Sequence, residues 1–257
     1  MRGDQERFKA LCGQITGAEK AGGPIGTLSE KTLHAVLKLY FEPNPENHEV
    51  KLGSFYADAV GENGILEIQT RSLYRLKQKL MYFLAVARVT LVYPIPRVRY
   101  VAWVNGETGE VSKRRKSPKR GRPADCFWEL YGVKEFLKHP NLTVRVVLVD
   151  VCDYRNLDGF DESRKRGSTR LERIPEALAE DIVLSGPQDY LKLLDFPLPE
   201  EFTAADFQAA SKTPAENASR AVNILCHLGL CEKCGKRGRS HLYRFKEPYQ
   251  SDWRIPN

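Results

Sequence analysis

The sequence predicts an α/β protein with a mixed sheet, followed by a smaller C-terminal domain of helices and a hairpin. Helical spacing of apolar residues at 30–41 precedes two short strands rich in Val, Ile, Tyr and Phe. Further along, two helical segments precede a basic turn between two strands. The 257 residues, 42% of them hydrophobic, suffice for one large or two modest packed domains.

The first helix is expected over residues 30–41, with Ser29 as its N-cap. Its apolar positions are Leu33, Val36, Leu37, Tyr40 and Phe41, which follow helical spacing. Glu30 lies three and seven residues before Leu33 and Leu37, so it is expected near the inward face. Residues 1–28 contain Gly22-Gly-Pro-Ile-Gly26 and are expected to form a flexible N-terminal segment.

Two strands are expected at 54–60 and 64–69, joined by the turn Gly61-Glu-Asn-Gly64. Side chains alternate along a strand, so Glu67 and Gln69 should share one face. In one interpretation this face is solvated and binds nothing. In the other, Asp58, Glu67 and the backbone carbonyl of Ile68 hold Mg²⁺ (or Mn²⁺), hard cations that prefer oxygen ligands, and Gln69 positions the attacking water.

This order of elements, completed by a helix from Ser72, resembles the core of the PD-(D/E)XK (restriction-endonuclease-like) nuclease superfamily over residues 29–104. The resemblance implies that Asp58 and Glu67 are the acidic residues of the motif and that Gln69 occupies the position usually held by Lys. It also implies that Glu30 matches the helix Glu of the Holliday-junction-resolvase branch. A neutral amide can only orient water. Lys77 on the next helix could supply the missing cation; the alternative is a lysine snorkelling at the edge of the core.

The middle of the chain alternates strand and helix signals. Strands are expected at 89–95, 98–105, 110–114 and 142–151, with a hairpin at 105–109 and a helix at 124–137. The nuclease-like domain therefore spans 29–153. Residues 154–187, with a Gly-containing basic loop and several prolines, are expected to form a basic connector.

Residues 188–247 resemble a winged helix-turn-helix domain, followed by a tail at 248–257. Helical segments at 202–210 and 215–229 would form the motif, with 190–194 as the first helix. The resemblance implies that the second motif helix exposes Glu216, Asn217, Ser219 and Arg220 to a major groove. Lys236, Arg237 and Arg239 on the wing would meet phosphates or the minor groove. The alternative is a winged helix used for protein contact.

Basic residues concentrate in loops, within a net charge of +7 and a pI near 9.0. Residues 113–122 contain seven cations and no acid, and Lys119-Arg-Gly-Arg-Pro123 resembles an AT-hook that enters the minor groove of A·T tracts. Simple phosphate contact and a solvated loop are the alternatives. The expected DNA contacts from the basic loops are Arg114, Arg115, Lys119, Arg120, Arg122, Arg164, Lys165 and Arg166.

Six cysteines in this length do not indicate a disulfide scaffold. Cys226, Cys231 and Cys234, with His227 and His241, form the only metal-like cluster in the sequence; buried thiols are the alternative to a zinc site. The N-terminus lacks an apolar signal core, and the longest apolar run, 80–87, is too short to span a membrane. A cytoplasmic, nucleoid-associated protein is expected.

These observations predict a metal-dependent DNA endonuclease, a hydrolase that uses Mg²⁺ (or Mn²⁺) and takes DNA as its partner. A catalytically degenerate DNA-binding protein with the same fold is the alternative, and an interaction module of a defence or repair assembly is a third. No phosphate-binding glycine loop followed by Lys-Ser/Thr occurs in the sequence, so no nucleotide cofactor is expected. A homodimer is implied only by the resemblance.

Overall fold

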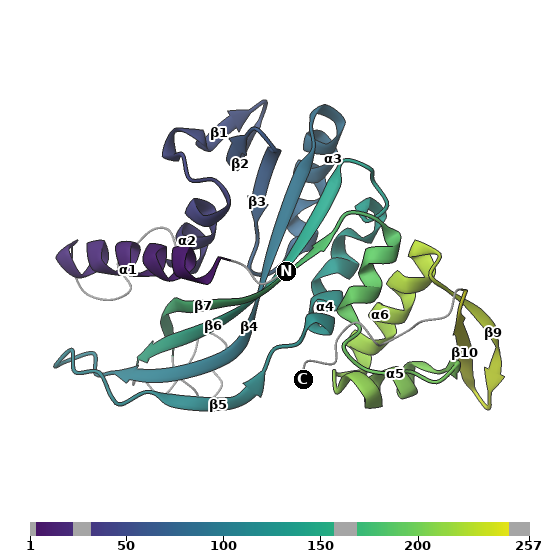
Figure 1. Cartoon of the computed structure of the whole chain (residues 1–257). Coiled ribbons are helices and arrows are strands. Elements are labelled where there is room, and N and C mark those ends of the chain that lie inside the picture. Colours follow the sequence, from purple (N-terminus) through teal and green to yellow (C-terminus); the bar gives the residue numbers. More distant parts are fainter. Residues whose placement is uncertain (1–3, 23–31, 157–168, 247–257) are drawn as a thin grey trace. The chain divides into compact units, whose positions relative to one another are not determined.

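The computed structural model describes residues 4–22, 32–156 and 169–246. The chain divides into two compact units, each built from three separate stretches (Figure 1). The first unit contains 1–61, 94–121 and 147–181, and the second contains 62–93, 122–146 and 182–257. The chain therefore alternates between the units.

A mixed sheet confirms the predicted α/β class. Within the described residues it has seven strands in the order β1-β2-β3-β4-β6-β7, with β5 paired to β4. These are β1 (His48–Leu52), β2 (Phe55–Gly61), β3 (Gly64–Ile68), β4 (Val89–Val104), β5 (Arg115–Arg120), β6 (Leu142–Asn156) and β7 (Arg170–Leu184). β1 and β2 are antiparallel, β3 and β4 are parallel, and β4 and β5 are antiparallel.

Two helices of the first unit pack against each other. They are α1 (Gln5–Gly22) and α2 (Thr32–Phe41), and a short 3-10 helix η1 (Pro45–Asn47) follows. Phe8 is fully buried and its ring meets that of Tyr40 edge-on, with centroids 5.4 Å apart. Residues 1–28 were expected to be flexible or lightly docked; of these, residues 5–22 form α1, which docks on α2 through Phe8. Ser29 and Glu30 lie outside the described residues.

The predicted hairpin strands are present, and β3 leads into a helix of the second unit. The 3-10 helix η2 (Leu73–Leu76) runs directly into α3 (Lys77–Val86). This helix connects β3 to the parallel strand β4, as a crossover between parallel strands requires. Ile65, Leu66 and Ile68 of β3 are buried, and so is Glu67 between them.

Several elements of the middle region differ from the prediction. β4 is one continuous strand rather than two, and the helix predicted at 124–137 is broken. It consists of η3 (Pro123–Cys126), α4 (Phe127–Leu130) and η4 (Tyr131–Phe136), with non-helical dihedrals at Val133. The connector prediction is also wrong for residues 170–184, which form β7; Leu178, Ile182 and Leu184 of that strand are buried.

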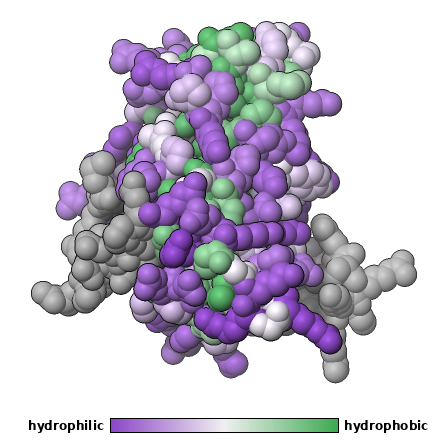
Figure 2. Space-filling view, turned by 90° about the vertical axis from the view of Figure 1, so that its right-hand side faces the viewer, coloured by the Kyte–Doolittle hydropathy of each residue, from purple (hydrophilic) through white to green (hydrophobic). Residues whose placement is uncertain are grey.

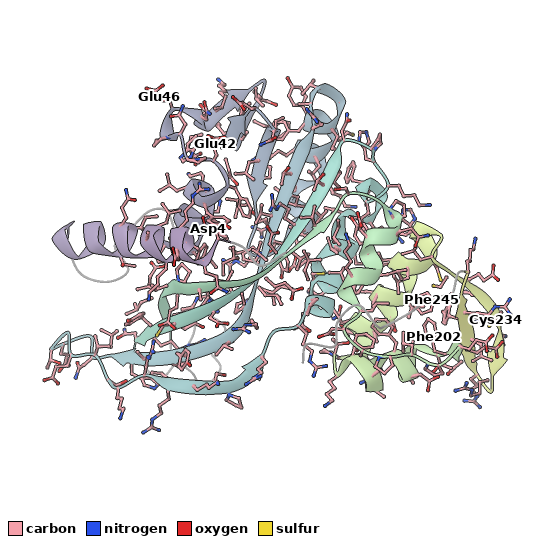
Figure 3. The ribbon with its side chains drawn as sticks, in the orientation of Figure 1. Asp4, Glu42, Glu46, Phe202, Cys234 and Phe245 are labelled. Atoms are coloured by element: carbon pink, nitrogen blue, oxygen red, sulfur yellow. The ribbon has the colours of Figure 1, made fainter. Side chains whose placement is uncertain are left out.

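The C-terminal elements follow the predicted order of helices and strands. They are η5 (Pro187–Leu193), β8 (Glu201–Phe202), α5 (Ala204–Ser211), α6 (Ala215–Leu228), β9 (Cys231–Arg237) and β10 (Ser240–Phe245), with a second sheet in the order β8-β10-β9. Thr203 caps α5 by accepting a hydrogen bond from the Asp206 amide. Gly229, at φ +81°, ends α6. The rings of Phe202 and Phe245 pack with centroids 5.2 Å apart (Figure 3).

One face of the molecule is predominantly hydrophilic, with apolar side chains in small separate areas (Figure 2). Within the described residues, the helices are all too short or too polar to cross a membrane.

Candidate active site

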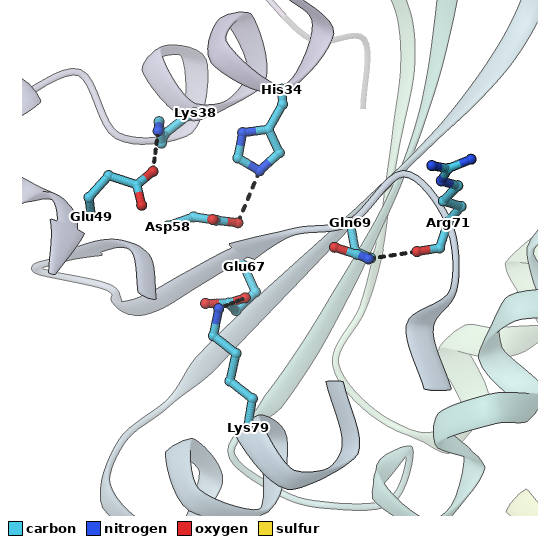
Figure 4. A network of polar contacts seen from close by, with 8 residues as sticks. All are labelled: His34, Lys38, Glu49, Asp58, Glu67, Gln69, Arg71 and Lys79. Atoms are coloured by element: carbon cyan, nitrogen blue, oxygen red, sulfur yellow. Dashed lines mark hydrogen bonds and ion pairs between the residues drawn. The ribbon is translucent and has the colours of Figure 1, made fainter. Parts of the chain in front are cut away.

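A buried ion pair joins the predicted catalytic strand to the helix that follows it. Glu67 on β3 is only 2% exposed, and its carboxylate oxygen lies 2.7 Å from the Nζ of Lys79 on α3 (Figure 4). The Lys79 ammonium group lies 5.6 Å from the ring centroid of Phe83, one turn later on the helix. The interpretation that Glu67 belongs to a solvated face is wrong, because β3 is an interior strand of the sheet order.

Gln69 follows β3 and is half-buried. Its backbone amide donates to the carbonyl of Val92, and its side-chain Nε2 donates to the carbonyl of Arg71 at 2.6 Å. The latter bond braces the turn that precedes Ser72, whose φ is +60°. Ile68, whose carbonyl was predicted as a metal ligand, is buried opposite Val92 in the parallel pair.

Asp58 belongs to the first unit, whereas Glu67 and Gln69 belong to the second. Its Oδ2 lies 3.2 Å from the Nε2 of His34 on α2. One turn later, the buried Lys38 lies 2.6 Å from Glu49 on β1. α2 therefore directs a polar row toward acidic residues of the strands (Figure 4). Glu30, the helix acid that the resemblance assigns to the site, lies outside the described residues.

The structure brings a lysine of α3 to Glu67, but it is Lys79 rather than Lys77. Lys77 pairs instead with Glu135 at 2.7 Å, and both side chains are about half exposed (49% and 45%). The prediction that Lys77 reaches the site is therefore corrected. Lys79 and His34 were both missed by the sequence reasoning. The four-residue spacing of Glu30, His34 and Lys38 was a detectable signal for a polar row on α2.

The carboxylate oxygens of Asp58 and Glu67 are of the ligand type that Mg²⁺ prefers. Carboxylates are the side chains that this hard cation prefers, and it is often bound by one or two of them together with water and substrate phosphate. The Asp58 side chain is 17% exposed. In the described parts of the chain, no three His, Cys, Asp or Glu side chains form a preassembled metal cluster.

The predicted AT-hook is not a free loop. Residues 115–120 form β5 against β4, and the Gly121 amide donates to the carbonyl of Pro96. A Cβ on Gly121 would lie 2.5 Å from that carbonyl oxygen, so this glycine is packed against the strand. The Arg-Gly-Arg segment is thus held against β4 rather than extended as a free loop.

The predicted cations around this strand differ in availability. Arg115, Lys119 and Arg120 are exposed along the strand. Arg114 stacks over the Tyr100 ring and pairs with Glu176, while Arg122 donates to the Ser211 carbonyl. Arg164, Lys165 and Arg166 lie outside the described residues.

The predicted recognition helix α6 is partly covered by α4, which lies alongside it (Figure 1). Asn217 is buried and donates to the Ala124 carbonyl, so its prediction as a base-reading side chain is wrong. The Arg220 guanidinium lies 3.5 Å from the centroid of the Trp128 ring. Ser219 and Glu216 are exposed, as predicted.

On the wing, Lys236 and Arg239 are exposed. The Arg237 guanidinium forms an ion pair with the Asp206 carboxylate on α5, at 3.0 Å. The thiols of Cys226 and Cys231 lie 3.1 Å apart, whereas Cys234 is exposed on β9 (Figure 3). Of the three cysteines in this cluster, Cys231 fits the expectation of a buried thiol, whereas Cys226 is half-buried.

Comparison with known proteins places the chain in a family. Residues 31–185 match the model of a domain of unknown function, DUF8091. The chain belongs to the DUF8091 family. An "Uncharacterized protein" of Treponema pallidum (strain Nichols) is 31% identical over 229 residues, which cover 87% of this chain and 88% of that protein. No solved structure matches the chain. The DUF8091 match contains Asp58, Glu67 and Lys79, whereas α5, α6 and the wing lie beyond it.

Proposed function

We propose that this DUF8091 protein is a Mg²⁺-dependent DNA endonuclease, with Mn²⁺ as an alternative ion, built on a PD-(D/E)XK core. The observation that carries the proposal is the buried Glu67–Lys79 pair, which places an acid and a cation together at the end of an interior strand. Burying such a pair costs desolvation energy, and apolar residues of similar volume are often as stable or more stable there. A functional use of the two charges is a sufficient reason for their presence.

In this mechanism Glu67 would hold the ion from β3, and Asp58 is the second carboxylate that the resemblance to the PD-(D/E)XK motif assigns to the ion. A bound divalent ion polarises the scissile phosphate and lowers the pKa of water. Lys79 then stabilises negative charge that develops on the phosphate, which is the task of the lysine that Gln69 replaces in the motif. Gln69 orients water by hydrogen bonding once its amide is released from the Arg71 carbonyl. Phosphate contacts from exposed cations such as Lys119 and Lys236 position the duplex.

One observation favours the alternative, a DNA-binding protein that no longer cuts. The Gln69 amide is already bonded to a backbone carbonyl of its own turn at 2.6 Å. A side chain committed in this way braces the backbone and does not touch substrate. In that case the exposed cations still bind DNA, and residues 188–247 act as a winged helix without a reaction at β3.

A plasmid-nicking assay decides between the two. With Mg²⁺ or Mn²⁺ present, Asp58→Asn and Glu67→Gln should each abolish nicking while DNA affinity, measured in EDTA, stays within a few-fold. Glu135→Gln is the matched control, because it also removes a carboxylate paired with a lysine of α3, but at the surface. If the wild type cleaves neither duplex, single-stranded nor branched DNA, the DNA-binding alternative is favoured. Full nicking activity of Glu67→Gln would refute the active-site assignment.

A further inference from the structure

Three exposed aromatic side chains gather on the second unit, where most proteins would place polar residues. They are Tyr74 on η2, Trp128 on α4 and Tyr131 at the start of η4, and they are 55%, 40% and 36% exposed. The Leu73 amide donates to the Glu129 carboxylate at 2.8 Å, which fastens η2 to α4. A Cβ on Gly132 would lie 2.9 Å from the Cβ of Tyr74, so Tyr74 lies directly beside η4. We call these three rings the aromatic platform.

Cations accompany each ring of the platform. The Arg220 guanidinium lies 3.5 Å from the Trp128 centroid and 5.4 Å from that of Tyr131. Lys134 lies 4.9 Å from the Tyr131 centroid, and Arg75 lies 5.8 Å from that of Tyr74. Each ring therefore has a positive charge within the range of a cation–π interaction.

The hydrogen bonds of these cations leave their charge available. In the described part of the chain, Arg220 donates to the Trp128 carbonyl, Lys134 to the side-chain oxygen of Asn223, and Arg75 to the Tyr74 hydroxyl. These acceptors are all neutral, so they orient the cations without neutralising them. An anion that approached the platform would meet the positive charges of Arg220, Arg75 and Lys134, the last of which also attracts the Glu135 carboxylate.

The same contacts argue against insertion of α6 into a duplex groove. Asn217 is buried and donates to the Ala124 carbonyl of η3, and Arg220 is stacked on Trp128, so neither of these predicted base-reading side chains extends from α6 toward a groove. Exposed rings flanked by cations suit a different ligand. Unpaired bases stack on aromatic rings, and the phosphates that link them contact lysine and arginine. A duplex hides its base faces between neighbouring pairs and offers only phosphates and groove edges.

We propose that the aromatic platform binds the unpaired nucleotides of a single-stranded polynucleotide. The inference rests on the proposed function in that it gives the nuclease a substrate with an unpaired segment. Binding itself requires neither metal nor cleavage, so the platform and the active site can fail separately.

The test measures fluorescence anisotropy of the full chain, in EDTA, with labelled oligothymidine and with a duplex of equal length. Trp128→Leu keeps an apolar side chain but removes the π-face, and should weaken oligothymidine binding about tenfold, the effect of losing one stacked base. Its duplex affinity should stay within about twofold, because phosphate contacts persist. Trp128→Phe retains a ring and should recover most of the loss. Met81→Ala is the control for removing exposed apolar surface, because the Met81 side chain on α3 of the same unit is 65% exposed.

The outcomes separate the possibilities. Unchanged oligothymidine affinity in Trp128→Leu, an equal loss on duplex, or no single-strand binding by the wild type would each overturn the platform. The last result, together with self-association that disappears in Trp128→Leu, would assign the rings to a protein contact instead. If oligouridine binds more tightly than oligothymidine, and Trp128→Leu weakens both equally, the platform is supported and RNA is identified as its ligand. Full nicking by Glu67→Gln refutes the active site but leaves this result standing.

Discussion

The Nζ of Lys79 lies 2.7 Å from a carboxylate oxygen of Glu67, in a strand whose other residues from 65 to 68 are apolar and buried. The two opposite charges depend on each other, because the partly exposed Lys79 is a partner of a carboxylate that is almost fully buried. The pair therefore links the integrity of β3 and α3 to the candidate chemistry at Glu67.

Breaking this pair should destabilise the fold. Lys79→Met should lower the free energy of unfolding by about 3 kcal/mol, because it takes the lysine partner away from the buried Glu67 carboxylate. Glu67→Gln combined with Lys79→Met should recover a large part of that loss. Urea unfolding measures both. Lys77→Met is the matched control: its pair with Glu135 is at the surface, so the change should stay below about 1 kcal/mol. Equal losses in the two single variants would show that the buried pair has no special weight.

A second prediction concerns the position of the catalytic lysine. If Lys79 serves in place of the lysine missing at 69, Lys79→Met should reduce nicking by about 100-fold or more, the usual scale for losing one group that stabilises transition-state charge. Adding Gln69→Lys to Lys79→Met should restore part of the rate, since it returns an ammonium to the strand. Gln69→Lys alone should keep or raise the rate. No rescue in the double variant, measured at a temperature at which both variants are fully folded, would contradict the exchange of roles.

The elements that carry this site were largely predictable, because local patterns determine them. The Gly61–Gly64 turn between apolar segments predicted β2 and β3, and helical spacing predicted α2. The burial of Glu67 was not predictable, because alternation cannot distinguish a solvated face from an interior strand covered by a helix. The lysine of α3 was assigned two residues away from the correct one. Lys77 and Lys79 are separated by only two positions, and only packing shows which of them is directed toward β3.

Long-range packing explains the other differences. Residues 170–184 lack a clean alternation and contain Pro175, yet they form β7 because pairing with the sheet satisfies their backbone groups. The prediction of an exposed face on α6 assumed that no other element covers this helix. The hydrogen bond from Asn217 to the Ala124 carbonyl of η3, 93 residues earlier in the sequence, reverses the prediction for Asn217.

The exposed edge strand β5 should contribute salt-dependent DNA affinity. Lys116→Gln combined with Lys119→Gln should flatten the log-log salt dependence of duplex binding by about 0.9 for each phosphate that is no longer neutralised. Affinities at several salt concentrations give this slope. Arg114→Gln is the control, since its guanidinium already pairs with Glu176 and should release fewer counterions from DNA. An unchanged slope in the double variant would remove β5 from the DNA-binding surface.

Asp153 should make the first unit sensitive to acid. Burial alone would raise its pKa, but the paired guanidinium of Arg173, at 2.6 Å and 2.9 Å, together with Arg99 lowers it overall. A lowered pKa in the folded state gives stability that is present above the unfolded value, about 3.9, and is lost as the pH falls through the folded value. Asp153→Asn should therefore cost about 3 kcal/mol at neutral pH. This difference from wild type should shrink below about pH 4.

Urea unfolding of both proteins at neutral and acidic pH measures that difference. Glu232→Gln removes an exposed carboxylate paired with Arg244 and should change stability by less than about 1 kcal/mol at neutral pH. A difference between Asp153→Asn and wild type that is constant with pH would mean that the loss comes from packing and not from ionisation.

The cysteines of the second unit should react in an order that exposure alone would not give. The hydrogen bond from the Cys231 thiol, aided by Lys233 and Lys246 against partial burial, lowers the pKa of Cys226. Partial desolvation and the Glu201 carboxylate raise the pKa of Cys234, although Cys234 is the more exposed. The thiolate is the nucleophile, so below about pH 8 iodoacetamide should label Cys226 before Cys234.

Peptide mass spectrometry across a pH series measures this order. Cys231→Ala removes the thiol that donates to Cys226, so the pKa of Cys226 should rise and its labelling should shift to higher pH. Cys231→Ser keeps a hydroxyl donor at the same position and should shift it less. If Cys234 is labelled first at every pH, or if the two substitutions act alike, the contact between Cys226 and Cys231 does not control the reactivity of Cys226.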